Sequence, residues 1–407
     1  MEDILTQPEG APPVDQGQLH RAASAYWATE LPQLRPTMLL PRKGLTGGTF
    51  PFSEPGIQYV HFARNAIYLL VKKMGLSGRE VLLPAYFHGV ELEALLAAGV
   101  QPRFFAVRGR MRVEPDDIIA ALTPRTRAIY LIHYAGFPGP AGEVQNICRE
   151  RGLLLIEDCA LALLSKAGDR PLGSFGDAAV FCLYKTLPTI DGGAIVMREG
   201  QLEISGVAPG RVGTTRHTAA SLLTHLEKTR GPIIRRLAHT AKAVGKAVTN
   251  RQATDWVDVG TQHFAVEDVN LLMSRLSRRV LDAQDFASIV RTRRRNYLLL
   301  DSLLRDIAPP VFESLPDGMC PLFYPFSTPH KHVYWRRLRE QGVEAVLFWL
   351  GGELGPRPGE FPEVDELRRT VLELPCHQDM TEEQIDRLAK IVRKLHEGRG
   401  EMNRWQA

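Results

Sequence analysis

The sequence predicts an α/β fold in which a mostly parallel β-sheet lies between layers of helices. One observation is a set of three runs that are apolar on both faces, as in a sheet that helices cover on each side. They are Arg127–Tyr134, Leu153–Asp158 and the stretch that begins at Val180. A second observation is that segments with helical spacing alternate with apolar runs, as in repeated βαβ units.

Each of the three runs carries, at or near its end, a side chain that can take part in catalysis, namely His133, Asp158 and Lys185. Ligands bind outside the carboxyl ends of parallel strands, so we expect these side chains to converge on one pocket. A lysine at a strand end is more often a solubilising group, and the two upstream side chains favour the functional interpretation. Together they suit pyridoxal 5′-phosphate (PLP), since the amine forms a Schiff base and the carboxylate pairs with the pyridinium nitrogen.

Five short motifs follow one another along the chain. They are His133-Tyr134-Ala135-Gly136-Phe137-Pro138, Glu157-Asp158-Cys159-Ala160, Gly173-Ser174-Phe175-Gly176-Asp177, Lys185 followed by Gly192-Gly193, and Leu372–Met380. In this order and spacing they resemble the DegT/DnrJ/EryC1/StrS family of PLP-dependent, fold-type I sugar aminotransferases. The resemblance runs from about Phe62 to Leu395, which is most of the chain.

The resemblance implies a fold, a reaction and an assembly. The fold is PLP-dependent transferase fold type I, with a large domain around a mostly parallel, seven-stranded-type sheet and a smaller C-terminal α+β domain. The reaction moves an amino group from glutamate or glutamine to a keto-sugar, often nucleotide-linked, through a Schiff base on Lys185 with Asp158 at the pyridinium nitrogen. The assembly is a homodimer with shared active sites.

We divide the chain into three parts. Residues 1–50, rich in Pro, Gly and Gln, are expected to form an extended arm with a short helix around Gln18–Glu30. Family members often lay such an arm across a dimer partner, and a partly disordered tail is the alternative. Residues 51–270 form the large PLP-binding domain, and residues 271–407 form a connecting helix and the small domain.

The apolar periodicity places further elements in chain order. In the large domain they are helices at Phe62–Met74, Glu91–Ala98 and Pro115–Leu122, and strands at Glu80–Pro84 and Pro102–Val107. In the C-terminal part they are one long helix at Met273–Leu304, strands at Leu322–Phe326 and Val343–Phe348, and helices at Val333–Gln341 and Glu382–His396. Thr381 is the predicted N-cap of the last helix.

Some cofactor contacts depart from the family pattern. Ala63 and Arg64 stand where the family has Ser-Gly-Thr, at a helix start whose free amides attract the phosphate. We expect Arg64 to add a guanidinium to the phosphate, and a surface-exposed Arg64 is the alternative. His88 is the candidate for stacking on the pyridine ring, with Tyr86 and Phe87 as rivals and a solvent-facing histidine as the alternative.

Other positions extend this candidate cofactor site. Leu161 replaces the glutamine that would reach the phenolic oxygen of the cofactor. Cys182 or Tyr184 stands in for a serine that the family has before its lysine, and the sequence does not choose between them. Asn270 resembles the asparagine that reaches the phosphate of the dimer partner.

Residues 205–263 form a basic insertion with helical stretches at Ala219–Lys228 and Pro232–Val248. Its basic residues between positions 211 and 251 are opposed by a single acidic residue, Glu227. Such a run is usually a solvated helix face. The alternatives are a docking surface for a nucleotide diphosphate, an acidic protein or an anionic membrane surface.

Composition limits the remaining possibilities. The chain has 407 residues with a net charge of +4, so we expect a soluble globular protein with no nucleic-acid partner. Its five cysteines form no CxxC pair, which indicates reduced thiols in a cytoplasmic protein, and no metal site is predicted. No apolar run approaches the roughly 18 residues that span a bilayer, and the first residues lack a signal-peptide pattern.

Rival functions stay open at this point. One is a PLP-dependent sugar dehydratase, although the dehydratase branch of the family replaces the lysine by histidine and Lys185 is intact. Another is a PLP enzyme that acts on a non-sugar substrate. A third is a non-catalytic regulatory or scaffolding member, which the departures at the cofactor contacts favour and the joint presence of Asp158 and Lys185 opposes.

Overall fold

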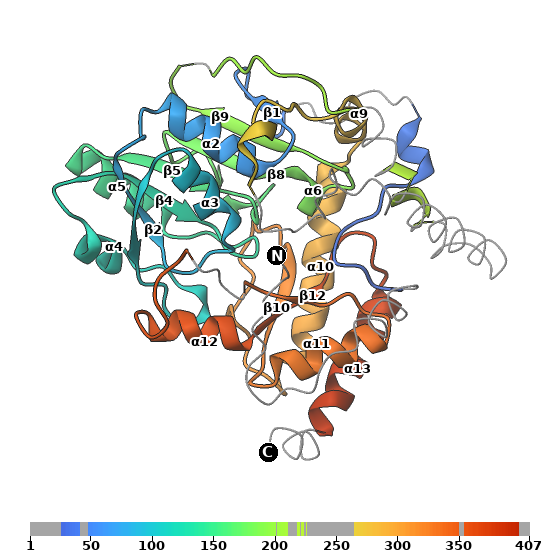
Figure 1. The fold of residues 1–407 in the computed structure, drawn as a ribbon. Helices are drawn as coiled ribbons and strands as arrows, with labels where there is room; N and C mark the ends of the chain where they lie inside the picture. The colour runs from blue at the N-terminus through green and yellow to red at the C-terminus, as the bar shows by residue number, and fades with distance from the viewer. Residues whose placement is uncertain are drawn as a thin grey trace, which may run out of the picture.

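A seven-stranded sheet forms the centre of the large domain, in the strand order β1-β9-β8-β5-β4-β2-β3 (Figure 1). Its strands are β1 (Gln58–Val60), β2 (Glu80–Pro84), β3 (Gln101–Phe105), β4 (Thr126–Ile132), β5 (Leu154–Asp158), β8 (Ala178–Cys182) and β9 (Gly193–Met197). The five strands from β3 to β8 run parallel, while β9 and β1 are antiparallel to their neighbours. The predicted mostly parallel sheet is therefore confirmed.

The fold is taken from a computed structural model that describes residues 26–40, 48–200, 202–210, 264–349 and 354–398. It also describes residues 218, 219, 221–223 and 225. The predicted helices at Ala219–Lys228 and Pro232–Val248 lie mostly or wholly outside the described residues, as does most of the basic insertion. No helix of the described part is long and apolar enough to cross a membrane.

The strands of the large sheet are buried on both faces because helices cover the sheet on each side. Every residue of β2 and β8 is buried, which leaves no face of these strands for water. The helices of this domain are α2 (Ala63–Lys73), α3 (Val90–Ala97), α4 (Pro115–Ala121), α5 (Ala141–Arg151) and the single turn α6 (Leu183–Thr186). Short 3₁₀ turns occur at η1 (Pro36–Leu39), η2 (Gly109–Met111) and η3 (Val266–Asp268).

The C-terminal part forms a smaller sheet with its own helices. Strands β10 (Phe323–Ser327), β12 (Val371–Pro375) and β11 (Val346–Leu347) pair antiparallel in that order. Their helices are α11 (Lys331–Glu340), α12 (Pro362–Thr370) and α13 (Glu382–Glu397), and a hairpin of β6 (Lys166–Ala167) and β7 (Arg170–Pro171) belongs to the large domain. The Thr381 cap is confirmed, since its hydroxyl accepts from the Gln384 amide while the Gln384 side chain accepts from the Thr381 amide.

The connecting segment is two helices, and the prediction of one helix over Met273–Leu304 is wrong. Helix α9 (Arg275–Asp282) ends before a break, and α10 (Phe286–Leu304) begins after it. The break is fixed by Asp285, whose carboxylate accepts a 2.9 Å hydrogen bond from the Ser288 amide. A side chain that caps a new helix competes with continuation of the old one.

The described part of the N-terminal arm packs on its own small domain. The segment from Tyr26 to Glu30 is not helical, which corrects the C-terminal end of the predicted short helix, and Ala28 forms a parallel bridge with Val343. The Gln33 amide donates to Asp379 at 2.7 Å, and Arg35 forms an ion pair with the same carboxylate. Residues 1–25 lie outside the described residues.

A fully buried arginine on α10 joins the two domains. Figure 1 shows α10 running from beside α6 toward α13. The Arg293 guanidinium donates to the carbonyls of Pro321 and Leu322, to the Gln378 side chain and, at 3.2 Å, to the carbonyl of Thr186. Because Thr186 follows Lys185, this cation fixes the backbone that carries the candidate catalytic amine.

We expect Arg293→Met to lower the free energy of unfolding by about 3 kcal/mol, because several buried carbonyls lose a charged donor. Urea denaturation followed by circular dichroism measures the change. Arg291→Met, on the exposed side of the same helix, is the matched control and should stay within about 0.5 kcal/mol of wild type. Equal stability of the two variants would contradict the anchoring role of Arg293.

Candidate active site

A cavity of about 440 Å³ lies between the large sheet and the small domain. The large domain lines it with Ala63, Arg64, His88, Glu91, Asp158, Cys182, Tyr184 and Lys185. The arm and the small domain line the other side with Glu30, Trp335, Arg339, Trp349 and Glu373. The cavity thus gathers an amine, several carboxylates, a histidine and two guanidinium groups in one space of ligand size.

Lys185 and Asp158 enter this cavity from neighbouring strands. Asp158 is the last residue of β5, and Lys185 lies in α6, directly after β8, which pairs parallel with β5. Asp158 is 4% exposed, and the positive charge of Lys185 is close enough to stabilise its carboxylate. The expected convergence of these two side chains is what the parallel pairing produces.

The surroundings of Asp158 act on it in opposite directions. Burial and the neighbouring Glu91 carboxylate raise the pKa of Asp158 to about 6. Hydrogen bonds from the Tyr130 hydroxyl (2.6 Å) and the Ala160 amide (2.8 Å), together with Lys185, favour the ionised form. These hydrogen bonds therefore orient the Asp158 carboxylate before a cation, such as a protonated pyridine nitrogen, binds to it.

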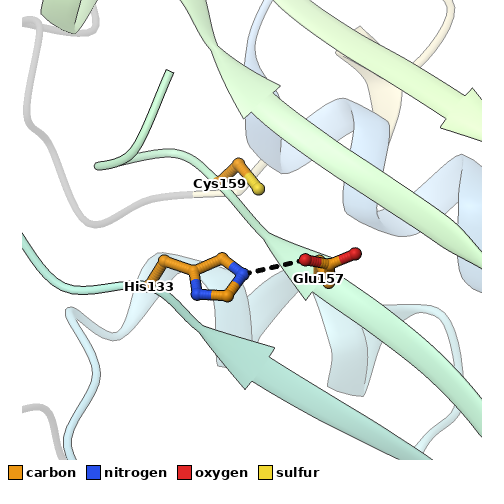
Figure 2. Close-up of side chains that lie close together, drawn as sticks. All are labelled: His133, Glu157 and Cys159. Carbon is orange, nitrogen blue, oxygen red and sulfur yellow. Dashed lines mark hydrogen bonds and ion pairs between the residues drawn. The ribbon is translucent and has the colours of Figure 1, made fainter. Parts of the chain in front are cut away.

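His133 does not join the cavity-lining residues of the described chain, which corrects its predicted convergence with Asp158 and Lys185. Ile132 pairs with Asp158 across β4 and β5, so His133 turns to the opposite face, the one that carries Glu157. Figure 2 shows His133 and Glu157 pointing toward each other, with Nε2 and the carboxylate 3.0 Å apart. A register of one residue thus decides which side chain reaches the pocket.

In the cluster of Figure 2, His133 and Glu157 are joined by a hydrogen bond, and Cys159 lies beside them. The His133 Nδ1 accepts from the Gly139 amide at 2.9 Å, so Nε2 carries the proton that is donated to Glu157. Glu157 also accepts from the amides of Gly173 and Gly176, and these bonds hold the turn between β7 and β8.

The start of α2 is brought to the cavity by a glycine contact. A Cβ on Gly193 would lie 2.5 Å from the Phe62 carbonyl carbon and 2.6 Å from the Ala63 nitrogen, and Gly192 has a φ of +135°. Only glycine lets β9 and the N-terminus of α2 approach this closely. Ala63 and Arg64 consequently line the cavity, and Arg64 also lies over the Phe62 ring, 4.4 Å from its centroid.

His88 lines the cavity on the loop between β2 and α3. Burial, Lys185 and Arg64 lower its pKa to about 4, so the ring is neutral at physiological pH. The Glu91 carboxylate accepts from the amides of His88 (2.8 Å) and Gly89 (3.1 Å), which fixes the loop from inside. The rival stacking candidates Tyr86 and Phe87 are buried and are not among the cavity-lining residues of the described chain.

The same loop is held from outside by the small domain. Arg368 of α12 donates to the carbonyls of Ala85 (3.1 Å) and Phe87 (3.4 Å), and it also donates to the carbonyl of Trp349. The Trp349 ring in turn packs against Tyr86, with ring centroids 5.2 Å apart. We call this set of contacts the Arg368 brace.

Four further residues named in the sequence analysis have distinct surroundings. Leu161 lines the cavity where the family has glutamine, and both Cys182 and Tyr184 line it near Lys185. Burial raises the pKa of the Cys182 thiol and that of the Tyr184 hydroxyl. Asn270 is exposed, next to the segment whose Leu271 carbonyl accepts from the His61 amide at 2.8 Å.

Several cavity residues were not predicted from the sequence, namely Glu30, Glu91, Trp335, Arg339, Trp349 and Glu373. Burial and Glu344 raise the pKa of Glu30 to about 7, while burial and Glu30 raise that of Glu373. The alternation in Leu372-Glu373-Leu374 was a usable signal, since it places the glutamate on the opposite face from two core leucines. Glu30 had no such signal, because its position depends on the docking of the arm.

The comparisons with known proteins agree with this geometry. Residues 60–221 match the DegT/DnrJ/EryC1/StrS aminotransferase family. The resemblance carried by the sequence motifs is therefore confirmed over these residues, which include Asp158 and Lys185.

Two curated relatives differ in how much of the chain they match. The chain is 35% identical over 150 residues to a dTDP-4-dehydro-2,3,6-trideoxy-D-glucose 4-aminotransferase of Saccharopolyspora spinosa. This match covers 36% of this chain and 39% of that enzyme. It is 24% identical over 356 residues to a UDP-N-acetyl-3-dehydro-alpha-D-glucosamine 3-aminotransferase of Acidithiobacillus ferrooxidans. This second match covers 82% of each chain. The first match thus spans well under half of the relative's length.

A solved structure has the same fold. The aminotransferase TlmJ from Streptoalloteichus hindustanus superposes with a TM-score of 0.59 at 24% identity, covering 83% of this chain and 85% of that one. The predicted fold class, with a large mostly parallel sheet and a small C-terminal domain, is confirmed.

We expect Gly193→Ala to destabilise the protein by about 2 kcal/mol, because the added methyl group would overlap the backbone at Phe62 and Ala63. Urea titration is the measurement. Gly56→Ala is the matched control, since its Cβ would meet nothing within 4 Å and should change stability by no more than about 0.5 kcal/mol. A Gly193→Ala protein as stable as the control would refute the close approach.

Proposed function

We propose that this chain is a PLP-dependent aminotransferase that transfers an amino group to a nucleotide-linked keto-sugar. The observation that carries the proposal is the placement of Lys185 and Asp158 in one cavity, at the ends of adjacent parallel strands. An amine and a buried carboxylate in this relation suit the carbonyl carbon and the pyridine nitrogen of PLP. The match of residues 60–221 to the DegT/DnrJ/EryC1/StrS aminotransferase family supports the same assignment.

The cavity residues fit the parts of this cofactor. When bound, PLP supplies an aldehyde carbon and an electron-withdrawing ring. The Lys185 Nζ would provide the amine for that carbon and would move a proton from the Cα of the amino donor to the same carbon. Asp158 would hold the proton on the ring nitrogen, and the neutral His88 imidazole would cover the ring face.

The phosphate has a natural place at the start of α2. The free amides around Ala63 attract an anion, and Arg64 adds a guanidinium that replaces the missing hydroxyl of the family pattern. Cys182 and Tyr184 remain joint candidates for the serine position beside Lys185. The side of the cavity at the large domain is therefore assigned to the cofactor.

The opposite wall suits a polyhydroxy acceptor. Glu30 and Glu373 offer carboxylate oxygens that accept hydrogen bonds from hydroxyl groups, and Trp335 and Trp349 offer flat apolar surfaces for the C–H faces of a ring. This favours a sugar over an apolar substrate. The role of the basic insertion in holding a nucleotide diphosphate stays a proposal, because Arg235 and Arg236 lie outside the described residues.

Arg339 is the guanidinium in this wall, so we assign it to the carboxylate of a glutamate or glutamine donor. It lies over the rings of Tyr26 and Trp335, with its central carbon 4.9 Å and 5.3 Å from their centroids. These rings fix the direction of the side chain. The arm therefore contributes to donor binding through Tyr26.

We also propose a homodimer in which Asn270 reaches the partner's cofactor phosphate. The exposed side chain of Asn270 supports this assignment, because it leaves the amide accessible to a second subunit. Light scattering at working concentrations reports the assembly.

Reduction with borohydride in the presence of PLP, followed by peptide mapping, should place the pyridoxyl group on Lys185. Lys331 is a demanding internal control, since burial lowers its pKa to about 7 while its Nζ is held by the carbonyls of Phe348 and Arg368 at 2.7 Å each. Lys331 should stay unlabelled, and Lys185→Arg should abolish labelling. A label on Lys331, or none at all, would overturn the proposal.

Arg339→Gln should raise the KM for the amino donor by about ten-fold or more, since a hydrogen bond to a charged group is lost. The KM for the acceptor should change little. Half-reactions followed by the visible absorbance of the bound cofactor separate the two substrates. Arg336→Gln, exposed on the same helix, is the control, and an equal donor KM in both variants would remove Arg339 from this role.

A further inference from the structure

The buried carboxylate of Asp158 accepts a hydrogen bond from Tyr130, a residue that the sequence analysis did not single out. Tyr130 lies on β4, one pleat before Ile132, and Ile132 pairs with Asp158. Side chains two residues apart share a face of the sheet, so the Tyr130 ring extends along the face that carries Asp158. Its hydroxyl donates to the Asp158 Oδ2 at 2.6 Å, and Tyr130 is 0% exposed.

The two carboxylate oxygens of Asp158 are divided between two donors. The Ala160 amide bonds Oδ1 at 2.8 Å, while Tyr130 bonds Oδ2. A hydrogen bond from a buried hydroxyl stabilises the ionised carboxylate, because the neutral acid accepts more weakly. The Tyr130 hydroxyl also needs this acceptor, since a buried hydroxyl without a partner is costly.

Glu91 opposes the effect of Tyr130. Its carboxylate lines the same cavity and raises the pKa of Asp158, whereas the Tyr130 hydroxyl lowers it. The titratable and charged groups that face Asp158 within the described chain come from α3, β4 and its end, the residue after β5, β8 and α6. They are Glu91, Tyr130, Tyr134, Cys159, Cys182 and Lys185.

We propose that Tyr130 is a positioning residue that keeps Asp158 ionised and oriented toward the ring nitrogen of the cofactor, against the repulsion of Glu91. The inference rests on the proposed function, because it takes Asp158 as the partner of that nitrogen. Tyr130 acts through Asp158 and does not line the cavity in the described chain. It adds to the site a residue that no family motif named above contains.

The first test measures the Asp158 carboxyl directly in the full chain without added cofactor. Carbon NMR of protein labelled at aspartate carboxyls gives the pKa, and Asp158→Asn identifies the resonance. Tyr130→Phe should raise the pKa of Asp158 by about one unit, whereas Glu91→Gln should lower it by a similar amount. Tyr134→Phe is the matched control, because the Tyr134 hydroxyl donates to the Tyr86 carbonyl at 2.7 Å instead.

An unchanged Asp158 pKa in Tyr130→Phe, or an equal shift in Tyr134→Phe, would overturn the inference. If Tyr130→Phe does not fold, wild-type protein labelled at the tyrosine Cζ decides the question. The Tyr130 resonance should then titrate together with Asp158 and lose this titration in Asp158→Asn. Absence of the titration would refute the contact.

The second test uses the pH dependence of PLP affinity. Since the cofactor needs the ionised carboxylate, a pKa raised from about 6 to about 7 should increase the Kd of Tyr130→Phe about five-fold at pH 6 and less than two-fold at pH 8. A loss of affinity that is equal at both values would mean a merely structural role and would overturn the inference. Failure of wild type to bind PLP would instead sink the proposed function, while the NMR test would still report on Tyr130.

Discussion

The buried Arg293 cation is the interaction on which the geometry of the site depends. Its guanidinium is 0% exposed and is satisfied by carbonyl and amide oxygens rather than by a carboxylate. Burial lowers its pKa, yet arginine keeps its charge in proteins, so the donors are permanent. The Thr186 carbonyl accepts from both Arg293 and Gln378, which holds the turn that carries Lys185 against the small domain.

The charges in the cavity divide into two groups with separate tasks. On the side of the large sheet, Asp158, Arg64 and His88 line the cavity, and we propose that they face the cofactor. On the side of the small domain, Glu30, Glu373 and Arg339 line it, and we propose that they face the substrates. Burial and Glu344 raise the pKa of Glu30 to about 7, so this wall holds a carboxyl group that can accept or release a proton near neutral pH. Burial and Glu30 also raise the pKa of Glu373.

Much of the fold and part of the site could be predicted from the sequence. Apolar runs with a polar end located β4, β5 and β8, and they correctly brought Asp158 and Lys185 to one cavity. The prediction that His133 reaches the cavity was wrong, because the register of β4 and β5 turns its side chain toward Glu157. Apolar periodicity does not reveal that register. The break at Asp285 and the docking of Glu30 also depend on tertiary contacts, since a local pattern cannot show which competing partner a side chain takes.

The Arg368 brace connects the two walls of the cavity. Arg368 and Trp349 belong to the small domain, yet they contact the loop that carries His88 on the other wall. If a ligand bound at one wall shifts the small domain, these contacts transmit the shift to the His88 loop. Binding at either wall would then change the affinity of the other wall by the same factor, because such coupling is reciprocal.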